Sequence, residues 1–209
     1  AGIVEINYSS EEDPLLISAK LSKLSEVEWA EPRFLYLPAF VPNDPSYNLQ
    51  WNLTKIKAEE AWNVTTGDTS VVIAIIDTGV DWDHPDIWNN LWINHGEIPS
   101  NGIDDDGNGY IDDYIGWDFG GVDGTPNNDP REDRPDHGTH VAGISSAVTN
   151  NGIGIASIGY KSKIMAVKTS RDDMRNPQNN APYIVYGYEG IVYAADNGAD
   201  VINCSWGGG

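Results

Sequence analysis

Apolar and polar residues follow one another in patterns that predict three buried strands and two longer helices over residues 70–209. The run from Val71 to Ile76 is continuously apolar and rich in β-branched residues, which is typical of a strand buried on both faces of a parallel sheet. Shorter runs predict strands at 163–168 and 201–205, and helical spacing predicts helices at 137–147 and 186–197, the second stopped by Gly198. Strands and helices in alternation predict an α/β fold: a doubly wound, mostly parallel sheet with right-handed crossovers.

The segments between these elements are polar or rich in turn-forming residues. Residues 57–62 predict one short helix, and residues 169–182 predict a polar loop. Residues 94–136 form a long stretch of Asp, Asn, Gly and Pro with no regular pattern. Loops of that length are usually functional, so we expect a site in this part of the chain.

The first 37 residues have a pattern of their own. Alternating residues from Gly2 to Tyr8 predict a strand, Asp13-Pro14 predicts a helix start, and residues 27–31 predict a second strand. Pro38 and the prolines that follow it mark a break, which divides the chain into residues 1–37 and 38–209. So small an α+β segment buries little apolar surface alone, and we expect it to need a partner surface.

Charge and composition exclude some classes of function. The formal net charge is −20, which argues against binding nucleic acid, because phosphates require Lys and Arg. Residues 77–136 hold 16 of the 32 Asp and Glu, with Arg131 and Arg134 as their only Lys or Arg. Such clustering favours bound cations, although a solvated acidic surface or a salt-adapted protein is the simpler alternative. No apolar run reaches the roughly 20 residues that span a bilayer.

The remaining general features concern context. Cys204 is the single cysteine, so an internal disulfide is excluded, and its apolar setting predicts a buried, inert thiol. The chain has no initiating Met and no signal peptide, so we expect an internal piece of a longer precursor.

Two short motifs carry the candidate chemistry. Asp77 closes the first predicted strand in Asp-Thr-Gly-Val-Asp, and His137 opens a predicted helix in His-Gly-Thr-His-Val-Ala-Gly. Each residue alone has an ordinary structural explanation: Asp77 as the cap of a turn, His137 as a satisfied structural group. His137 and His140 also suggest zinc, but no Cys or third His completes a tetrahedral set.

Together with His-Pro-Asp at 84–86 and Val-Ile-Asn-Cys-Ser-Trp-Gly-Gly at 201–208, these motifs resemble the subtilisin-like serine peptidases, most of all the thermitase branch. The resemblance covers residues 38–209 and implies a truncated subtilisin-like fold. It implies that His137 is the general base and that Asp77 orients it, in the chain order Asp, His, Ser. Ser205, Trp206 and Gly207 would then bind substrate backbone beside the specificity pocket.

The resemblance has one gap. The family's Gly-Thr-Ser-x-Ala serine and its oxyanion asparagine do not occur within residues 1–209. Ser205 fails as a substitute, because a Gly-x-Ser-x-Gly elbow requires an acid and a histidine after it. We therefore expect a peptidase whose 209 residues are inactive alone; the alternative is a calcium-binding remnant without catalysis.

The resemblance also implies partners and location. Residues 1–37 resemble the end of a subtilase propeptide, with an ordinary N-terminal extension as the alternative. The expected partners are a polypeptide substrate and the protein's own propeptide, with no nucleic acid and no membrane. The family resemblance implies a zymogen that is secreted or held at the cell surface.

Calcium is the expected cofactor, at three places. The resemblance implies a strong site formed by two carboxylates, an amide and backbone carbonyls, and a second site whose register is shifted by one inserted residue. A third follows from residue types alone, since its spacing copies the first nine positions of an EF-hand without the final Glu. In that order the candidate ligands are Asp44, Asp86, Val148, Asn151, Ile153 and Ile155; Asp118, Asp123, Thr125 and Asn127; and Asp104, Asp106, Asn108, Tyr110 and Asp112.

Overall fold

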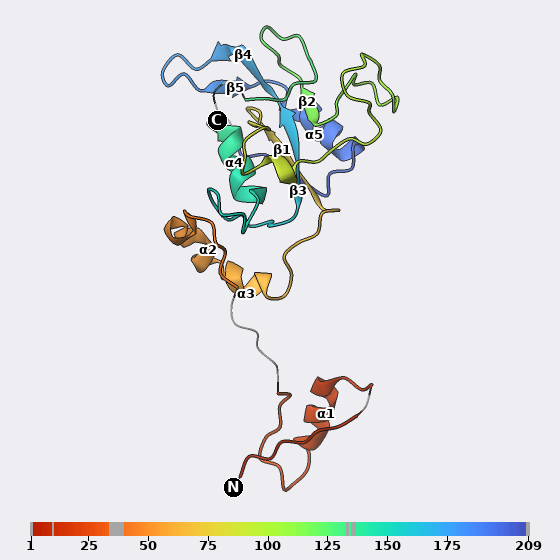
Figure 1. Cartoon of the computed structure of the whole chain (residues 1–209), viewed down its shortest axis with the longest axis vertical. Helices are drawn as coiled ribbons and strands as arrows, with labels where there is room; N and C mark the ends of the chain where they lie inside the picture. The colour runs from red at the N-terminus through yellow and green to blue at the C-terminus, as the bar shows by residue number, and fades with distance from the viewer. Residues whose placement is uncertain (1, 10, 34–39, 133, 135–136, 208–209) are drawn as a thin grey trace. The chain divides into compact units, whose positions relative to one another are not determined.

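The computed structural model comprises residues 1–209 and describes all of them except 1, 10, 34–39, 133, 135–136 and 208–209 (Figure 1). The chain divides into two compact units, Ala1–Pro38 and Ala39–Gly209. Each unit is described by itself.

The first unit contains one helix, α1, over Pro14–Leu21. Its start is as predicted: the Asp13 side chain accepts a hydrogen bond from Leu15 N at 2.8 Å, and proline occupies the first helical position. The two strands predicted beside it are wrong, because residues 2–9 and 27–33 are irregular. Their apolar side chains are largely exposed, Ile3 by 92%, and without a paired strand or a buried face an alternating pattern does not form a sheet.

The second unit is built on a sheet of four parallel strands in the order β2-β3-β1-β6. These strands are β1 (Val72–Asp77), β2 (Gly116–Asp118), β3 (Lys163–Lys168) and β6 (Val201–Asn203). The predicted α/β fold is therefore confirmed, and β3 has the predicted bounds. Asp77 on β1 is in register with Lys168 on β3, which is in turn in register with Asp118 on β2. Three charged residues thus end three adjacent strands.

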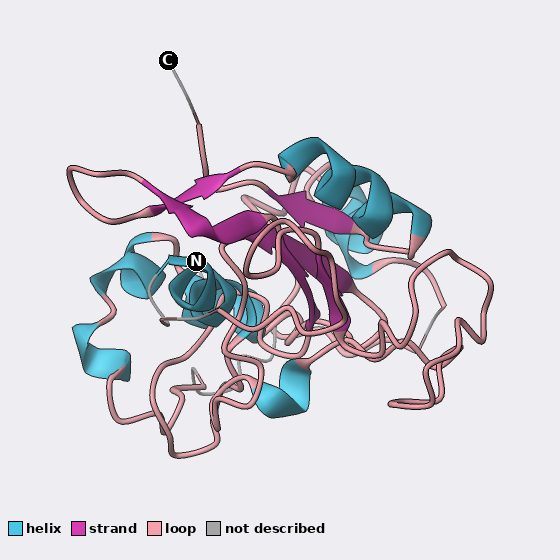
Figure 2. Cartoon of the chain, turned by 90° about the horizontal axis from the view of Figure 1, so that it is seen from above, coloured by secondary structure: helices cyan, strands magenta, loops and turns pink. Residues whose placement is uncertain are grey.

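One helix covers each face of this sheet (Figure 2). Ala142 of α4 (His137–Ser146) packs in a cluster with Ile75 of β1 and Ala166 of β3. Tyr193 of α5 (Gly187–Asp196) packs against the opposite face, which includes Ile76. Because successive strand residues point to opposite faces, Asp77 lies on the α4 face with Ile75.

Smaller elements complete the second unit. η1 (Tyr47–Leu49), α2 (Trp51–Lys55) and α3 (Ala58–Trp62) surround a cluster that includes Leu53 and Ala156, and η2 covers Trp88–Asn90. The polar loop expected at residues 169–182 is wrong in part: β4 (Ser170–Arg175) pairs antiparallel with β5 (Pro182–Ile184). Among the helices of the described residues, none has the length and apolar character that crossing a membrane requires.

Candidate active site

Asp77 and His137 lie side by side at the carboxyl end of the sheet. β1 ends at Asp77 and α4 begins at His137, and the two side chains meet with 2.7 Å between His137 Nδ1 and Asp77 Oδ1. The Asp77 side chain is 1% exposed, whereas the His137 side chain is 52% exposed. A buried carboxylate therefore fixes the Nδ1 edge of a half-exposed imidazole, and an ionised Asp77 requires Nδ1 to carry the proton.

The position of Asp77 is fixed by its neighbours. Thr78 N donates to Asp77 Oδ1 at 2.7 Å, and Thr169 donates to the Asp77 backbone carbonyl from its N at 2.9 Å and from its hydroxyl at 3.1 Å. Within the described residues, Asp77 Oδ2 is buried and has no hydrogen-bond partner. The acid is thus held by one oxygen and by its main chain.

Glu132, a residue that the sequence analysis missed, links the turn after Asp77 to the start of the helix at His137. Its Oε1 accepts from the Thr78 hydroxyl, from His137 N at 3.1 Å and from Gly138 N at 3.2 Å. Its Oε2 accepts from Thr139 N at 3.0 Å and from the Thr139 hydroxyl at 2.6 Å. Glu132 is 5% exposed. A Glu shortly before the first turn of a predicted helix was the available signal.

A buried lysine lies at the same edge of the sheet. Lys168 Nζ is 2.7 Å from Asp172 Oδ1 and 3.3 Å from Asp118 Oδ2. Burial raises the pKa of Asp118, against the hydrogen bonds from Gly120 N and Gly121 N and the charge of Lys168. The charges at this edge therefore alternate between acid and base.

The expected substrate-binding residues follow β6, next to β1. Asn203 is in register with Ile75. Trp206 Nε1 donates to the Ile76 carbonyl at 2.6 Å, while Ser205 Oγ donates to Asn203 Oδ1 at 2.7 Å and is exposed. Gly207 is exposed as well. These residues lie beside the strand that carries Asp77.

The prediction of a buried Cys204 is wrong, because its side chain is exposed. Cys204 directly follows β6, an edge strand, so one side of it meets no neighbouring strand within the described residues. Desolvation, followed by the nearby charge of Asp77, raises the pKa of its thiol. A raised pKa lowers the fraction of thiolate, the reactive form, and the expected inertness of Cys204 stays a prediction.

Asp44 and Asp86 converge on the loop at 148–155. Asn150 N donates to Asp44 Oδ2 at 2.8 Å, and Asp86 accepts from Asn151 Nδ2 at 2.8 Å and from Ile155 N at 3.0 Å. The two carboxylates are 4% and 2% exposed. Burial raises the pKa of Asp86, and the neighbouring charge of Asp44 adds to that rise.

One oxygen of this pair is unsatisfied. Asp44 Oδ1 is buried and lacks a hydrogen-bond partner within the part of the chain that the structure describes. A buried carboxylate oxygen next to a second carboxylate is costly unless a cation compensates it. The remaining expected ligands belong to the same loop: Val148 N donates to the Asp86 carbonyl, and Ile153 N donates to Asn151 Oδ1.

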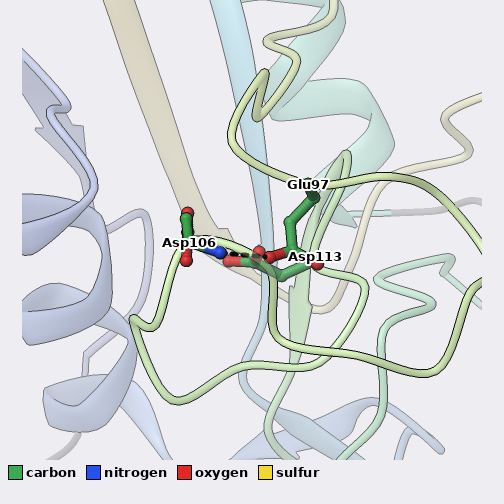
Figure 3. Close-up of side chains that lie close together, drawn as sticks. All are labelled: Glu97, Asp106 and Asp113. Carbon is green, nitrogen blue, oxygen red and sulfur yellow. Dashed lines mark hydrogen bonds between the residues drawn. The ribbon is translucent and has the colours of Figure 1, made fainter.

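The loop at 94–113 gathers a different set of acids from the expected one. Ligand oxygens of Glu97, Asp106 and Asp113 lie within 4.8 Å of one another, and Figure 3 shows the three side chains converging. The chain thus carries an acidic cluster whose geometry suits a metal ion. Asp106 was expected here; Glu97 and Asp113 were missed, because buried acids outside the repeated Asp-x-Asp spacing give no pattern.

The other residues expected in this site hold the loop together. Asp104 accepts from the backbone N of Gly107, Asn108 and Gly109, and Asp112 accepts from the backbone N of Asn101 and Gly102. Tyr110 packs edge-on against Tyr193, with ring centroids 4.8 Å apart. Two of its carboxylates thus accept backbone hydrogen bonds within the loop, and the expected EF-hand-like shell stays a prediction.

The second site expected from the resemblance stays a prediction. Asp118 pairs with Lys168, so a cation already lies beside it. Asp123 accepts from Thr125 N at 3.1 Å, and Asn127 Oδ1 accepts from Asp129 N at 2.8 Å. Each of these side chains stabilises its own turn.

Comparison with known proteins identifies relatives of the chain. Residues 68–209 match the subtilase family. The thermophilic serine proteinase of Bacillus sp. (strain AK1) is 38% identical over 182 residues, which cover 87% of this chain and 37% of that protein. Thermitase of Thermoactinomyces vulgaris is 38% identical over 170 residues, covering 81% of this chain and 49% of thermitase.

A solved protease structure from Pseudoalteromonas arctica superimposes with a TM-score of 0.59 at 27% identity, covering 81% of this chain and 51% of that one. The chain thus spans less than half the length of the two relatives above. The match over residues 68–209, which contains both Asp77 and His137, shows that the chain belongs to the subtilase family of serine peptidases.

Proposed function

We propose that this chain supplies the acid and the base of a serine endopeptidase that hydrolyses peptide bonds through an Asp-His-Ser triad. The observation that carries the proposal is the 2.7 Å contact between His137 Nδ1 and Asp77 Oδ1. The family membership of residues 68–209 supports it independently.

In the proposed reaction His137 removes the proton from a serine hydroxyl and later returns it to the leaving amine. Asp77 keeps the proton on Nδ1, so that Nε2 acts as the base, and Asp77 stabilises the imidazolium that forms. The exposures fit these roles: the acid is excluded from water at 1% exposure, and the base, at 52%, is open to a substrate.

Substrate binding is proposed at the residues after β6. An extended peptide lying along residues 205–207 would bind by main-chain hydrogen bonds, and pockets would read its side chains. The bond from Trp206 Nε1 to the Ile76 carbonyl holds this segment against β1, one residue before Asp77. A polypeptide substrate is therefore the proposed partner.

The nucleophile is proposed to lie outside these residues, because no Gly-Thr-Ser-x-Ala sequence occurs in positions 1–209. We expect the 209-residue chain to show no peptide hydrolysis and no labelling by a serine-directed fluorophosphonate. The full gene product is expected to be labelled, and Asp77→Asn is expected to lower its kcat by about 10⁴-fold. Full gene product that is folded yet neither labelled nor active would overturn the peptidase proposal in favour of a calcium-binding remnant.

Calcium is the proposed cofactor, and Asp44 and Asp86 are its proposed ligands with Asn151 and the carbonyls of Val148, Ile153 and Ile155. Two buried carboxylates, one with an oxygen that lacks a partner within the described residues, fit a hard cation that prefers oxygen ligands. When bound, calcium would neutralise the two acids and fix the 148–155 loop, which directly follows the helix of His137.

The N-terminal unit is proposed to be a propeptide remnant, and the intact protein is proposed to be a secreted or cell-surface zymogen. One relative, a protein of Natrialba magadii that is 34% identical over 182 residues, is described as a halolysin-like extracellular serine protease. The high acid content of residues 77–136 is compatible with a calcium-rich exterior. Cleavage between the two units during maturation, followed by mass spectrometry, tests the propeptide assignment.

A further inference from the structure

We propose that Glu132 is a positioning residue that holds the acid and the base of this site at their working distance. The inference rests on the proposed peptidase function, since Asp77 and His137 have their roles only there. The hydrogen bonds that Glu132 makes to described residues go to the first amides of α4 and to the hydroxyls of Thr78 and Thr139. Through them it acts on the two segments of chain from which the side chains of Asp77 and His137 project.

One half of the argument concerns the helix of the base. The first amide groups of an α-helix have no partner inside the helix, and they carry a partial positive charge. Glu132 accepts from the amides of His137, Gly138 and Thr139, the first three residues of α4. A single buried carboxylate therefore fixes the end of the helix at which the imidazole begins.

The other half concerns the turn of the acid. The Thr78 hydroxyl donates to Glu132 Oε1 and also accepts from Gly138 N at 2.9 Å. Thr78 directly follows Asp77, and its own N donates to Asp77 Oδ1. The carboxylate thus bridges Thr78, which is next to the acid, and His137, which is the base.

Close packing reinforces this bridge. A Cβ on Gly79 would lie 2.8 Å from Glu132 N, and a Cβ on Gly138 would lie 2.1 Å from the Gly79 carbonyl oxygen. Val80 N also donates to the Pro130 carbonyl at 3.0 Å. The segment before α4 is therefore pressed against the turn after β1, with no room for even a methyl group.

The chemistry of the acceptor explains why a carboxylate is required. The donor groups that reach Glu132 include three backbone amides and the hydroxyls of Thr78 and Thr139. An ionised carboxylate offers only acceptors, whereas the amide of Gln would turn its NH₂ group toward at least one of these donors. Gln is therefore not a substitute, even though its shape is nearly the same.

The first test uses the 209-residue chain and needs no catalysis. The Nδ1 proton of His137 is expected to give a downfield NMR signal from its hydrogen bond to Asp77. In Glu132→Gln and Thr78→Val we expect that signal to move upfield or to disappear through exchange with water. In Thr78→Ser, which keeps the hydroxyl, we expect the signal to remain. Asp200→Ala is the control: it removes the bond from Val72 N at the other end of β1 and should leave the signal unchanged.

The second test uses the full gene product with a peptide substrate. Displacement of a base by an ångström costs on the order of 100-fold in rate, so we expect Glu132→Gln and Thr78→Val to lower kcat by about 10- to 100-fold. KM should stay within about twofold, because substrate binding does not involve Glu132. Thr78→Ser should retain most of the wild-type kcat.

The outcomes separate this inference from the proposed function. Absence of peptidase activity in the wild-type gene product would refute the function, and the NMR signal would still decide whether Glu132 positions His137. If Glu132→Gln does not fold, the Thr78 pair decides alone. Folded Thr78→Val or Glu132→Gln with an unchanged His137 signal would overturn the inference, as would a loss confined to KM.

Discussion

Lys168 and Asp118 form a buried ion pair, with 3.3 Å between Lys168 Nζ and Asp118 Oδ2 and both side chains 3% exposed. Lys168 ends β3, between Asp118 on β2 and Asp77 on β1, and it also contacts Asp172 at 2.7 Å. The lysine therefore neutralises part of the negative charge at the edge of the sheet where the proposed active site lies. It does so at the position where family resemblance alone suggested calcium.

Lys168→Met should be strongly destabilising. The substitution keeps the apolar stem but removes the cation that pairs with the buried Asp118, and breaking a buried pair from one side costs about 3–5 kcal/mol. Urea unfolding of the 209-residue chain measures the change. Lys55→Met, at an exposed lysine of α2, should stay within about 0.5 kcal/mol. A double variant, Lys168→Met with Asp118→Asn, should recover part of the loss; equal stability of the single and double variants would contradict this account.

Calcium should stabilise the wild-type chain but not Asp44→Asn. At a calcium concentration of about 100 times Kd, binding to the native state alone adds about 2.7 kcal/mol, which a chelator would remove. For a chain of this size that corresponds to roughly 5–10 °C in Tm. Without calcium, Asp44→Asn should be as stable as wild type or more so, because it relieves the repulsion that adds to the raised pKa of Asp86.

Thermal unfolding with calcium and with chelator tests this prediction. Asp68→Asn, at an exposed acid, serves as the control and should keep the full calcium response. An equal chelator effect on wild type and Asp44→Asn would place the responding ion elsewhere, with the Glu97, Asp106 and Asp113 cluster as the next candidate.

Tyr47 should make the chain lose stability in alkaline solution. Burial and then the Glu59 carboxylate, to which its hydroxyl donates, raise the pKa of Tyr47 to about 12 from the ordinary 10.0. Between these values the unfolded chain has released the phenolic proton and the native chain has kept it. The unfolded state then binds fewer protons, so the free energy of unfolding falls as pH rises. Tyr47→Phe should remove this fall of the unfolding free energy between pH 10 and 12, whereas Tyr183→Phe, at an exposed tyrosine, should keep it. Urea unfolding across this pH range measures both.

The core of the fold could be predicted because its strands are buried on both faces. β1 and β3 are continuous apolar runs, and such runs stand out in a sequence. β4, with the sequence Ser-Arg-Asp-Asp-Met-Arg, has no such run and exists through its pairing with β5, a contact that local sequence does not encode. In the N-terminal unit the local pattern misleads in the opposite direction: residues 2–9 alternate like a strand, but they pair with no strand among the described residues and are irregular.

The candidate site divides in the same way. Asp77 and His137 stood out because both belong to distinctive motifs at the ends of regular elements. Glu132, Glu97 and Asp113 did not, since each is an acid in an acidic loop, and only burial and converging hydrogen bonds distinguish it. Which acids hold a loop and which could hold a metal is decided by backbone geometry, and residue spacing does not determine that geometry.

Two glycines of α4 should respond in opposite ways to alanine. A Cβ on Gly143 would meet only Ile155 Cδ1 at 3.5 Å, an ordinary contact, and Ala is the better helix former by about 0.5–1 kcal/mol. Gly143→Ala should therefore raise stability by that amount and leave the active site unchanged. On Gly138 the same atom would lie 2.1 Å from the Gly79 carbonyl oxygen and 3.0 Å from Thr78 Oγ1, so the helix would have to move away from the turn of Asp77.

Urea unfolding measures the stability of both glycine variants, and the NMR signal of the His137 Nδ1 proton reports the geometry of the contact with Asp77. Gly138→Ala should lose stability and displace the signal together, because one shift of the helix end causes both, whereas Gly143→Ala should change stability alone. Since the two substitutions add the same methyl group to the same helix, any difference between them comes from where that methyl points. A stable Gly138→Ala with an unaltered signal would mean that the helix start and the Asp77 turn are not in close contact in solution.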